Sequence, residues 1–178
     1  MGLKSTSERY GVMVVAMHWL TALLMIALIA TGFRAANAVD PAAKAAILRV
    51  HVPIAIAVLA LMVLRIGWWW GVDRKPDPIA GSPQWQERTA RAVHLLLYVS
   101  IFGMIASGIG MMALSGAAPM VFGGEGALLP DFWKYPPRVP HGIGGRLLVA
   151  LVVLHTGAAL YHQFVRRDHL LRRMWFSK

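Results

Sequence analysis

The sequence contains no cysteine and few acidic residues. The absence of cysteine from all 178 residues excludes disulfide scaffolds, thiolate-bound iron–sulfur clusters, zinc sites with sulfur ligands and covalently attached c-type haem. Any metal chemistry must therefore depend on the seven histidines. With 18 Lys and Arg against eight Asp and Glu, the formal charge is +10. In so apolar a chain this excess is typical of loops beside anionic lipid headgroups, and we expect no nucleic-acid partner.

Charged residues of either sign are scarce, whereas long apolar runs are frequent. Hydrophobic residues make up 57% of the chain and charged residues 15%, with a mean hydropathy of +0.56, which is too apolar for an ordinary soluble domain. A run of about 20 apolar residues crosses a hydrocarbon core of roughly 30 Å. Four runs meet this length, at residues 12–33, 47–70, 90–114 and 143–165. The sequence therefore predicts an all-α membrane protein, a single domain whose four transmembrane helices form a bundle.

The distribution of Lys and Arg predicts the orientation of this bundle. Twelve of the 18 basic residues fall on the side that holds both termini and the linker 71–89. Because cytoplasmic segments carry the excess of Lys and Arg, both termini should be cytoplasmic. The loops 34–46 and 115–142 should then lie outside.

The histidines in the predicted spans occur at matched depths. His141 and His155 are 14 residues apart, which is about 21 Å along a helix with only about 40° of angular drift. Two haems stacked across the bilayer, each with two axial imidazoles, would suit this spacing. By depth, His18 pairs with His155 and His51 pairs with His141. His94 lies at a depth similar to that of His18, and depth alone does not decide between them.

Further polar residues lie near these levels. His162 follows His155 by seven residues, about 10 Å along the helix, and is compatible with a ligand, a quinone contact or an interfacial histidine. Arg49 and Arg146 would lie near the outer haem, and Arg91 near the inner one. There they could pair with haem propionates, although basic residues that merely set the topology are the alternative.

Several short motifs occur in a fixed order along the chain. They are Arg9-Tyr10-Gly11, His18-Trp19-Leu20, Arg49-Val50-His51, Leu64-Arg65, the stretch 92–98, and the stretch 155–162 followed by Phe164 and residues 170–174. In this order and spacing the set resembles bacterial cytochrome b561 over nearly the whole chain.

The resemblance implies a dihaem cytochrome b of the bacterial inner membrane, with two haem b groups in a multi-pass bundle. The family's axial ligands map onto His18 and His155 for the cytoplasmic haem, and onto His51 and His141 for the periplasmic haem. This assignment agrees with the pairing by depth.

The resemblance also implies an activity. Members that resemble superoxide oxidase take electrons from periplasmic superoxide and deliver them to ubiquinone, which would make this chain a superoxide:quinone oxidoreductase. His162 and Trp19 match the family's positions near the quinone. Gln163 departs from the family, because many members have a second histidine there. Outer cations, among them Arg49, Arg138 and Arg146, would attract the superoxide anion.

Two other functions remain open at this point. The chain could be a membrane electron-transfer subunit that serves a separate dehydrogenase or a periplasmic redox partner. It could also be a haem-free bundle whose histidines bind a transition metal or relay protons for transport. The sequence also leaves open a homodimer.

Overall fold

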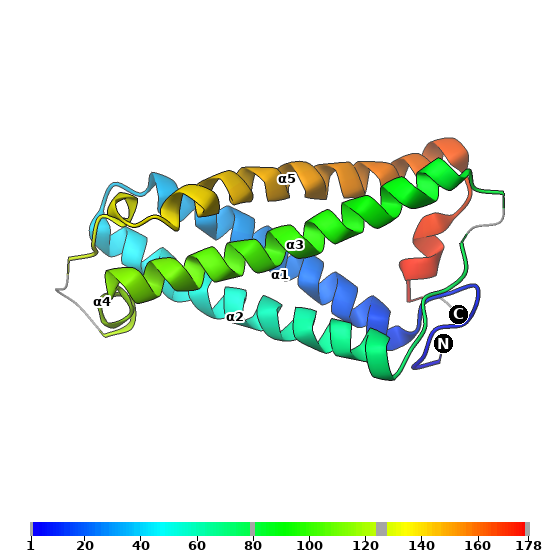
Figure 1. Cartoon of the computed structure of the whole chain (residues 1–178), viewed down its shortest axis with the longest axis horizontal. Coiled ribbons are helices and arrows are strands. Elements are labelled where there is room, and N and C mark those ends of the chain that lie inside the picture. The colour runs from blue at the N-terminus through cyan, green and yellow to red at the C-terminus, as the bar shows by residue number, and fades with distance from the viewer. Residues whose placement is uncertain (1, 79–80, 124–127, 177–178) are drawn as a thin grey trace. The chain divides into compact units, whose positions relative to one another are not determined.

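The computed structural model describes residues 2–78, 81–123 and 128–176, and these residues form helices and connecting segments without strands. Four long helices dominate the fold (Figure 1). They are α1 (Val12–Asn37), α2 (Pro41–Gly71), α3 (Gln84–Ser115) and α5 (Arg138–Tyr161). All four are long and apolar enough to cross a membrane. The predicted fold class, an all-α protein with four transmembrane helices, is confirmed.

α2 extends beyond its predicted apolar run because a polar group caps its first turn. α2 begins at Pro41, six residues before the predicted span, and Asp40 accepts hydrogen bonds from the backbone N–H groups of Ala42 and Ala43, both at 3.1 Å. An aspartate at the N-cap and a proline at the first helical position both favour a helix start, since proline has no N–H to leave unpaired.

Shorter elements lie in the connections and after α5. α4 (Ala118–Phe122) and η1 (Phe132–Lys134) occupy the predicted loop 115–142, and α5 already begins inside that loop. η2 (His162–Arg166) is a π-helical continuation of α5, and η3 (Leu170–Met174) is a 3₁₀ helix. Residues 124–127 of the loop and 79–80 of the linker 71–89 lie outside the described residues.

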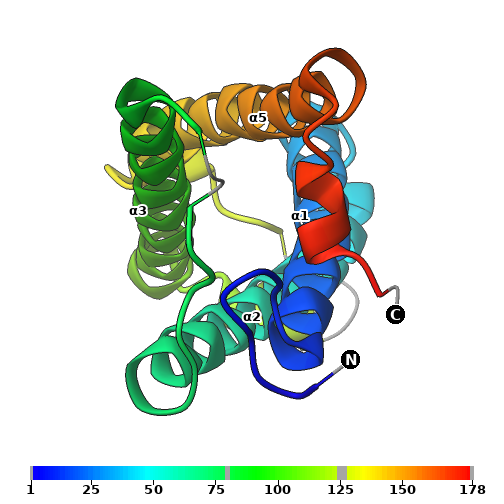
Figure 2. The ribbon, with the colours of Figure 1, turned by 90° about the vertical axis from the view of Figure 1, so that its right-hand side faces the viewer.

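The chain forms two compact units, and each long helix contributes a segment to both. Unit 1 comprises Met1–Ala22, Ala60–Leu97 and Ala150–Lys178. Unit 2 comprises Leu23–Leu59 and Tyr98–Val149. Within unit 1, α1 lies between α2 and α5, and α3 lies between the same two helices, so that the four segments surround a common axis (Figure 2).

Large apolar side chains cover the outward faces of the helices. Leu23, Ile26 and Val153 are each more than 60% exposed. In water this exposure would be unfavourable, but in a bilayer these faces contact hydrocarbon, and the helices satisfy their backbone hydrogen bonds internally. The pattern fits helices whose solvent is lipid.

The N-terminal segment of unit 1 is held by hydrogen bonds to Asp73. Its carboxylate accepts from the backbone N–H and hydroxyl of Ser5, at 3.0 and 2.8 Å, and from Trp68 Nε1 at 3.1 Å. Burial raises the pKa of Asp73, but hydrogen bonds from Ser5, Trp68 and the backbone of Arg74 outweigh it and bring the pKa below its usual value. The N-terminal segment is therefore attached to the end of α2 by a charged acceptor.

The C-terminal segment is attached to the same unit. Arg173 donates from Nε to the backbone carbonyl of Glu8 and from Nη2 to that of Asp77, both at 2.7 Å. Trp19 Nε1 donates to the backbone carbonyl of Met174 at 2.8 Å. These bonds hold η3 against the first turns of α1.

Candidate functional site

Two pairs of histidine rings face each other, one pair in each unit. The unit 1 pair is His18 and His155, whose ring centroids are 6.2 Å apart. The unit 2 pair is His51 and His141, at 6.5 Å. An imidazole nitrogen binds a transition metal at about 2 Å and lies about 1 Å from its ring centroid, so two imidazoles on opposite sides of one metal have centroids about 6 Å apart. Both pairs have this separation.

A third histidine lies beside the unit 1 pair. The ring centroid of His94 is 5.2 Å from that of His155, about 1 Å shorter than two imidazoles on opposite sides of one metal would require. The spacing therefore favours His18 over His94 as the partner of His155, a choice that helix depth left open. Among the described residues, no group of three His, Cys, Asp or Glu side chains is arranged to hold a metal ion.

Hydroxyl groups orient both rings of the unit 2 pair. Thr31 Oγ1 lies 2.9 Å from His51 Nδ1, and it donates its own hydrogen to the carbonyl of Ala27 at 2.7 Å. Because the hydroxyl hydrogen is used, the oxygen accepts a hydrogen bond from Nδ1–H. The ring is then the Nδ1–H tautomer, and Nε2 is free to bind a metal.

His141 on α5 has the same arrangement with Ser107 of α3. Ser107 Oγ lies 2.9 Å from His141 Nδ1 and 3.0 Å from the carbonyl of Met104, to which it donates. Both rings of the unit 2 pair therefore present Nε2, and each is held by a hydroxyl that is itself anchored to a helix backbone. Sequence inspection missed Thr31 and Ser107, because side-chain hydroxyls are common in apolar helices and neither lies near a histidine in sequence.

Two glycines leave space for these rings. A Cβ added at Gly32 would lie 3.3 Å from His51 Cε1, and one at Gly108 would lie 3.4 Å from His141 Cε1. The separation at Gly32 is tighter than most side-chain contacts, and that at Gly108 is at the lower limit of ordinary contact, so a side chain longer than alanine would press on either imidazole. Glycine at these two positions allows each ring to lie against the backbone of a neighbouring helix.

A single spacing relates the residues of the two sites. On every long helix, a residue at the unit 1 site and a residue at the unit 2 site are 14 positions apart, just under four helical turns, so that both lie on nearly the same face. The pairs are His18 and Gly32 on α1, Arg65 and His51 on α2, His94 and Gly108 on α3, and His155 and His141 on α5. Each helix therefore contributes to both sites.

Comparison with known proteins agrees with this geometry. Residues 9–177 match the profile of prokaryotic cytochrome b561. The chain belongs to the prokaryotic cytochrome b561 family. The resemblance noted from the sequence motifs is therefore confirmed, and with it a membrane electron-transfer protein with b-type haem.

Similar proteins occur in two bacteria. The chain is 27% identical to cytochrome b561 homolog 2 of Escherichia coli (strain K12), over 98% of this chain and 95% of the relative. It is 28% identical to cytochrome b561 homolog 1 of the same strain, over 56% of this chain and 58% of the relative. It is 29% identical to cytochrome b562 of Cereibacter sphaeroides, over 70% of this chain and 65% of the relative.

The residues present fit the haem that a prokaryotic cytochrome b561 binds. A haem iron that carries electrons needs two axial ligands, and each unit supplies two imidazoles at the required separation. In unit 2 the hydroxyls fix the tautomer that leaves Nε2 available. The two ring pairs are therefore the candidate axial ligands of this cytochrome.

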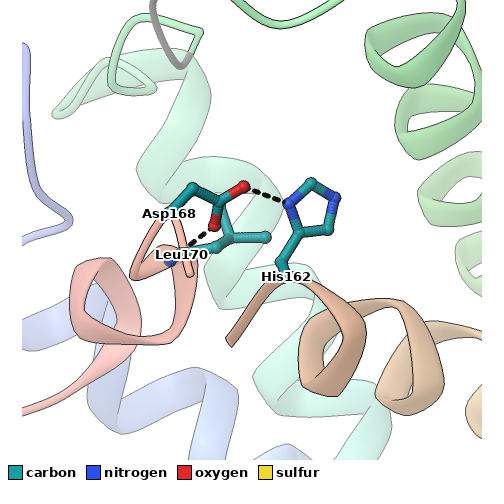
Figure 3. Close-up of polar contacts among 3 residues, drawn as sticks. All are labelled: His162, Asp168 and Leu170. Atoms are coloured by element: carbon teal, nitrogen blue, oxygen red, sulfur yellow. Dashed lines mark hydrogen bonds and ion pairs between the residues drawn. The ribbon is translucent and has the colours of Figure 1, made fainter. Parts of the chain in front are cut away.

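His162, for which the sequence left three roles open, is paired with a carboxylate in unit 1. Its Nδ1 lies 2.5 Å from Asp168 Oδ2, and Asp168 Oδ1 accepts from the backbone N–H of Leu170 at 3.2 Å (Figure 3). The carboxylate is thus fixed on both oxygens. Asp168 follows Arg167, whose φ of 55° is left-handed, and this turn brings the carboxylate back onto the end of α5.

A pocket of about 300 Å³ is lined by residues that flank His162 and Asp168 along the chain. Its walls are Gln163, Phe164, Leu171, Arg172 and Trp175. Gln163 Oε1 is buried and has no hydrogen-bond donor among the described residues. The pocket is largely apolar, with one cationic donor and one free acceptor, which is a composition that suits a small flat ligand with polar edges.

Aromatic rings connect this pocket to the unit 1 pair. The ring of Trp19 lies 5.5 Å from that of His18 and 5.4 Å from that of Trp175, which lines the pocket. The sequence prediction that Trp19 lies near His162 and a quinone rested on family positions. The structure shows that Trp175 and Gln163 line this pocket.

The three arginines predicted to lie on the outer side belong to unit 2 and have different surroundings. Arg49 donates from Nε to the carbonyl of Val121 at 2.5 Å. The guanidinium of Arg138 lies over the ring of Trp133 at 4.3 Å. Arg146 is exposed, with Nη1 donating to the carbonyl of Gly142 at 2.9 Å. All three remain candidates for contact with an anion.

Proposed function

We propose that this chain is a dihaem b-type cytochrome of the bacterial inner membrane, with both termini in the cytoplasm, that oxidises periplasmic superoxide and reduces ubiquinone. Two superoxide anions would each lose one electron to become dioxygen, while one quinone takes up two electrons and two protons to become quinol. The bound haems would supply reversible one-electron transfer. The two imidazole pairs are the single observation on which the proposal depends.

The charge of unit 2 supports an anionic electron donor. Unit 2 contains six Lys or Arg and three Asp or Glu, a net charge of +3. An exposed guanidinium such as that of Arg146 would attract superoxide to this unit, and the attraction would weaken as ionic strength rises.

The pocket in unit 1 supports a quinone as electron acceptor. The rings of Phe164 and Trp175 suit a flat headgroup, and Arg172 can donate a hydrogen bond to a quinone carbonyl. Gln163 Oε1, which has no donor among the described residues, would accept a hydrogen bond from a quinol hydroxyl. It cannot bond to a quinone carbonyl, because both oxygens are acceptors. These two side chains would therefore bind both the substrate and the product.

The pair of His162 and Asp168 supports a route for the protons. With Nδ1–H donating to the carboxylate, Nε2 is the atom that exchanges a proton. His162 would give a proton to the reduced quinone and recover it from water, while Asp168 orients the ring. Asp168 is then a positioning residue.

Superoxide-dependent reduction of a water-soluble ubiquinone analogue by the purified protein tests the proposal. We expect His162→Gln and Asp168→Asn to slow quinone reduction while both haem spectra stay unchanged. His169→Asn, an exposed neighbour at which Asn tolerates the left-handed backbone, is the matched control. Protein that is inert toward superoxide yet reducible by an added redox protein would contradict the proposal and favour an electron-transfer subunit. Loss of a haem in His162→Gln would instead make His162 a ligand.

A further inference from the structure

Arg65 is a charged residue inside a membrane-spanning helix without a partner for its buried nitrogen. It lies on α2, six residues before the helix ends at Gly71. Its Nε atom is buried and forms no hydrogen bond with the described residues. Charged side chains within transmembrane segments are costly and mark functional sites by default, and buried donors are rarely left unpaired.

The helix register places Arg65 at the unit 1 pair. It follows His51 on α2 at the same interval at which His155 follows His141 on α5. His155 is the common neighbour of His18 and His94 there, with ring centroids 6.2 and 5.2 Å from its own. Arg65 therefore belongs to the same cluster as the proposed axial ligands.

No carboxylate of the described chain neutralises this cation. None of the described acidic residues forms an ion pair with Arg65. Two of those in unit 1 are already engaged, Asp73 with Ser5 and Asp168 with His162. A guanidinium in this position calls for an anionic acceptor from outside the polypeptide.

His94 is the second member of the cluster without a role in ligation. Its ring is 5.2 Å from that of His155, too close for the two rings to lie on opposite sides of one haem iron. A neutral imidazole still has one N–H to donate. The proposed ligands of unit 1 come from α1 and α5. The other two helices, α2 and α3, contribute two hydrogen-bond donors to the same site, Arg65 and His94.

We propose that Arg65 and His94 bind a propionate carboxylate of the haem held by His18 and His155. The inference rests on the proposed ligand pair of unit 1. A haem brings carboxylates into the protein with it, and a guanidinium binds a carboxylate through two parallel hydrogen bonds. In unit 2 the two helices that supply no proposed ligand have glycines, Gly32 and Gly108, beside the rings, and these positions hold no counterpart of Arg65 and His94.

A cation at this position also favours the reduced haem, because reduction adds one negative charge. Removing it should lower the midpoint potential of the unit 1 haem and leave that of the unit 2 haem unchanged. Redox titration of the purified holoprotein, followed by visible absorbance, measures both potentials. Resonance Raman bands of the haem propionates report the carboxylate contact directly.

Arg65→Gln should lower one potential and shift one set of propionate bands. Arg65→Lys, which keeps the charge, should restore most of the potential. Arg88→Gln, which removes an exposed cation from α3, is the matched control and should change neither. Unchanged potentials and bands in Arg65→Gln, or equal shifts in Arg88→Gln, would overturn the proposal.

If Arg65→Gln does not retain haem, Arg65→Lys decides the question. Two haems with near wild-type potentials in Arg65→Lys would support the proposal, and haem loss in this variant too would contradict it. These measurements need neither superoxide nor quinone, so failure of the proposed redox activity would leave their outcome intact. A haem count in His18→Ala tests the ligand pair separately.

Discussion

Unit 1 and unit 2 use the same four helices to hold a histidine pair, yet they surround it with different side chains. In unit 2 the other two helices contribute Gly32 and Gly108, which leave space for the rings. In unit 1 the corresponding residues are Arg65 and His94, which add a charge and a hydrogen-bond donor. The ring separations are nearly equal, at 6.2 Å in unit 1 and 6.5 Å in unit 2. Helix register thus sets where a cofactor binds, while the remaining side chains set its electrostatic surroundings.

Removing a ring from either pair should have the largest effect and should separate the two units. We expect His141→Ala and His51→Ala to lose one haem, and His18→Ala and His155→Ala to lose the other, because an iron with one imidazole is held far less tightly. Haem per chain, measured as the pyridine haemochrome, should fall from two to one in each variant. If His94→Ala lost a haem and His18→Ala kept both, the assignment in unit 1 would be wrong.

Filling the space beside a unit 2 ring should have the next largest effect. Gly108→Leu places a side chain against His141, and overpacking of this kind typically costs about 1–3 kcal/mol. We expect weaker binding or loss of the unit 2 haem only, seen in the haem count and spectrum. Gly103→Leu is the matched control, because a Cβ there has nothing within 4 Å. Equal haem loss in the two variants would show that the contact with His141 is unimportant.

Removing the hydroxyls should produce a smaller and graded effect on unit 2. Ser107→Ala and Thr31→Val take away the acceptor of each Nδ1–H bond, and such outer partners of metal ligands typically contribute roughly 10- to 100-fold in affinity. A less basic imidazole stabilises oxidised iron less, so the midpoint potential of the unit 2 haem should rise. A redox titration that shows a shift in both haems, or in neither, would contradict this orientation role.

The smallest expected effect concerns the N-terminal segment, which belongs to unit 1 and is attached there through the bonds of Ser5 to Asp73. The folded-state pKa of Asp73 lies below its usual value, so its stabilising bonds are complete above that value and are lost as the pH falls through the folded pKa. Pepsin cleavage near the N-terminus should therefore accelerate only in strong acid. Asp73→Asn removes the charge of this acceptor, where a hydrogen bond to a charged group typically contributes about 1.5–3 kcal/mol, and should abolish this pH dependence. Persistence of the dependence in Asp73→Asn would assign it to another group.

The fold and the ring pairs were accessible from the sequence because both depend on periodicity. Apolar runs of this length leave few alternatives to membrane helices, and the spacing of His141 and His155 identifies two levels on one helix face. The same spacing could also have identified Arg65, which follows His51 at that interval. Without coordinates, however, Arg65 resembles the other basic residues that determine topology.

Other contacts could not be predicted because no periodic pattern encodes them. Asp168 reaches His162 only after Arg167 turns the chain with a φ of 55°, and a left-handed residue other than glycine leaves no sequence signal. The hydroxyls of Thr31 and Ser107 meet their imidazoles through the packing of different helices. Such contacts depend on side-chain rotamers and helix rotation.

The 14-residue spacing on the four helices restricts where residues can be inserted or deleted. Inserting or deleting one residue between His141 and His155, or within the matching interval of another helix, would rotate that helix's two site residues relative to each other by about 100° around the helix axis. A ring or donor would then point away from its cofactor. Connecting loops have no such constraint, so relatives should differ in length between the helices and keep these four intervals fixed.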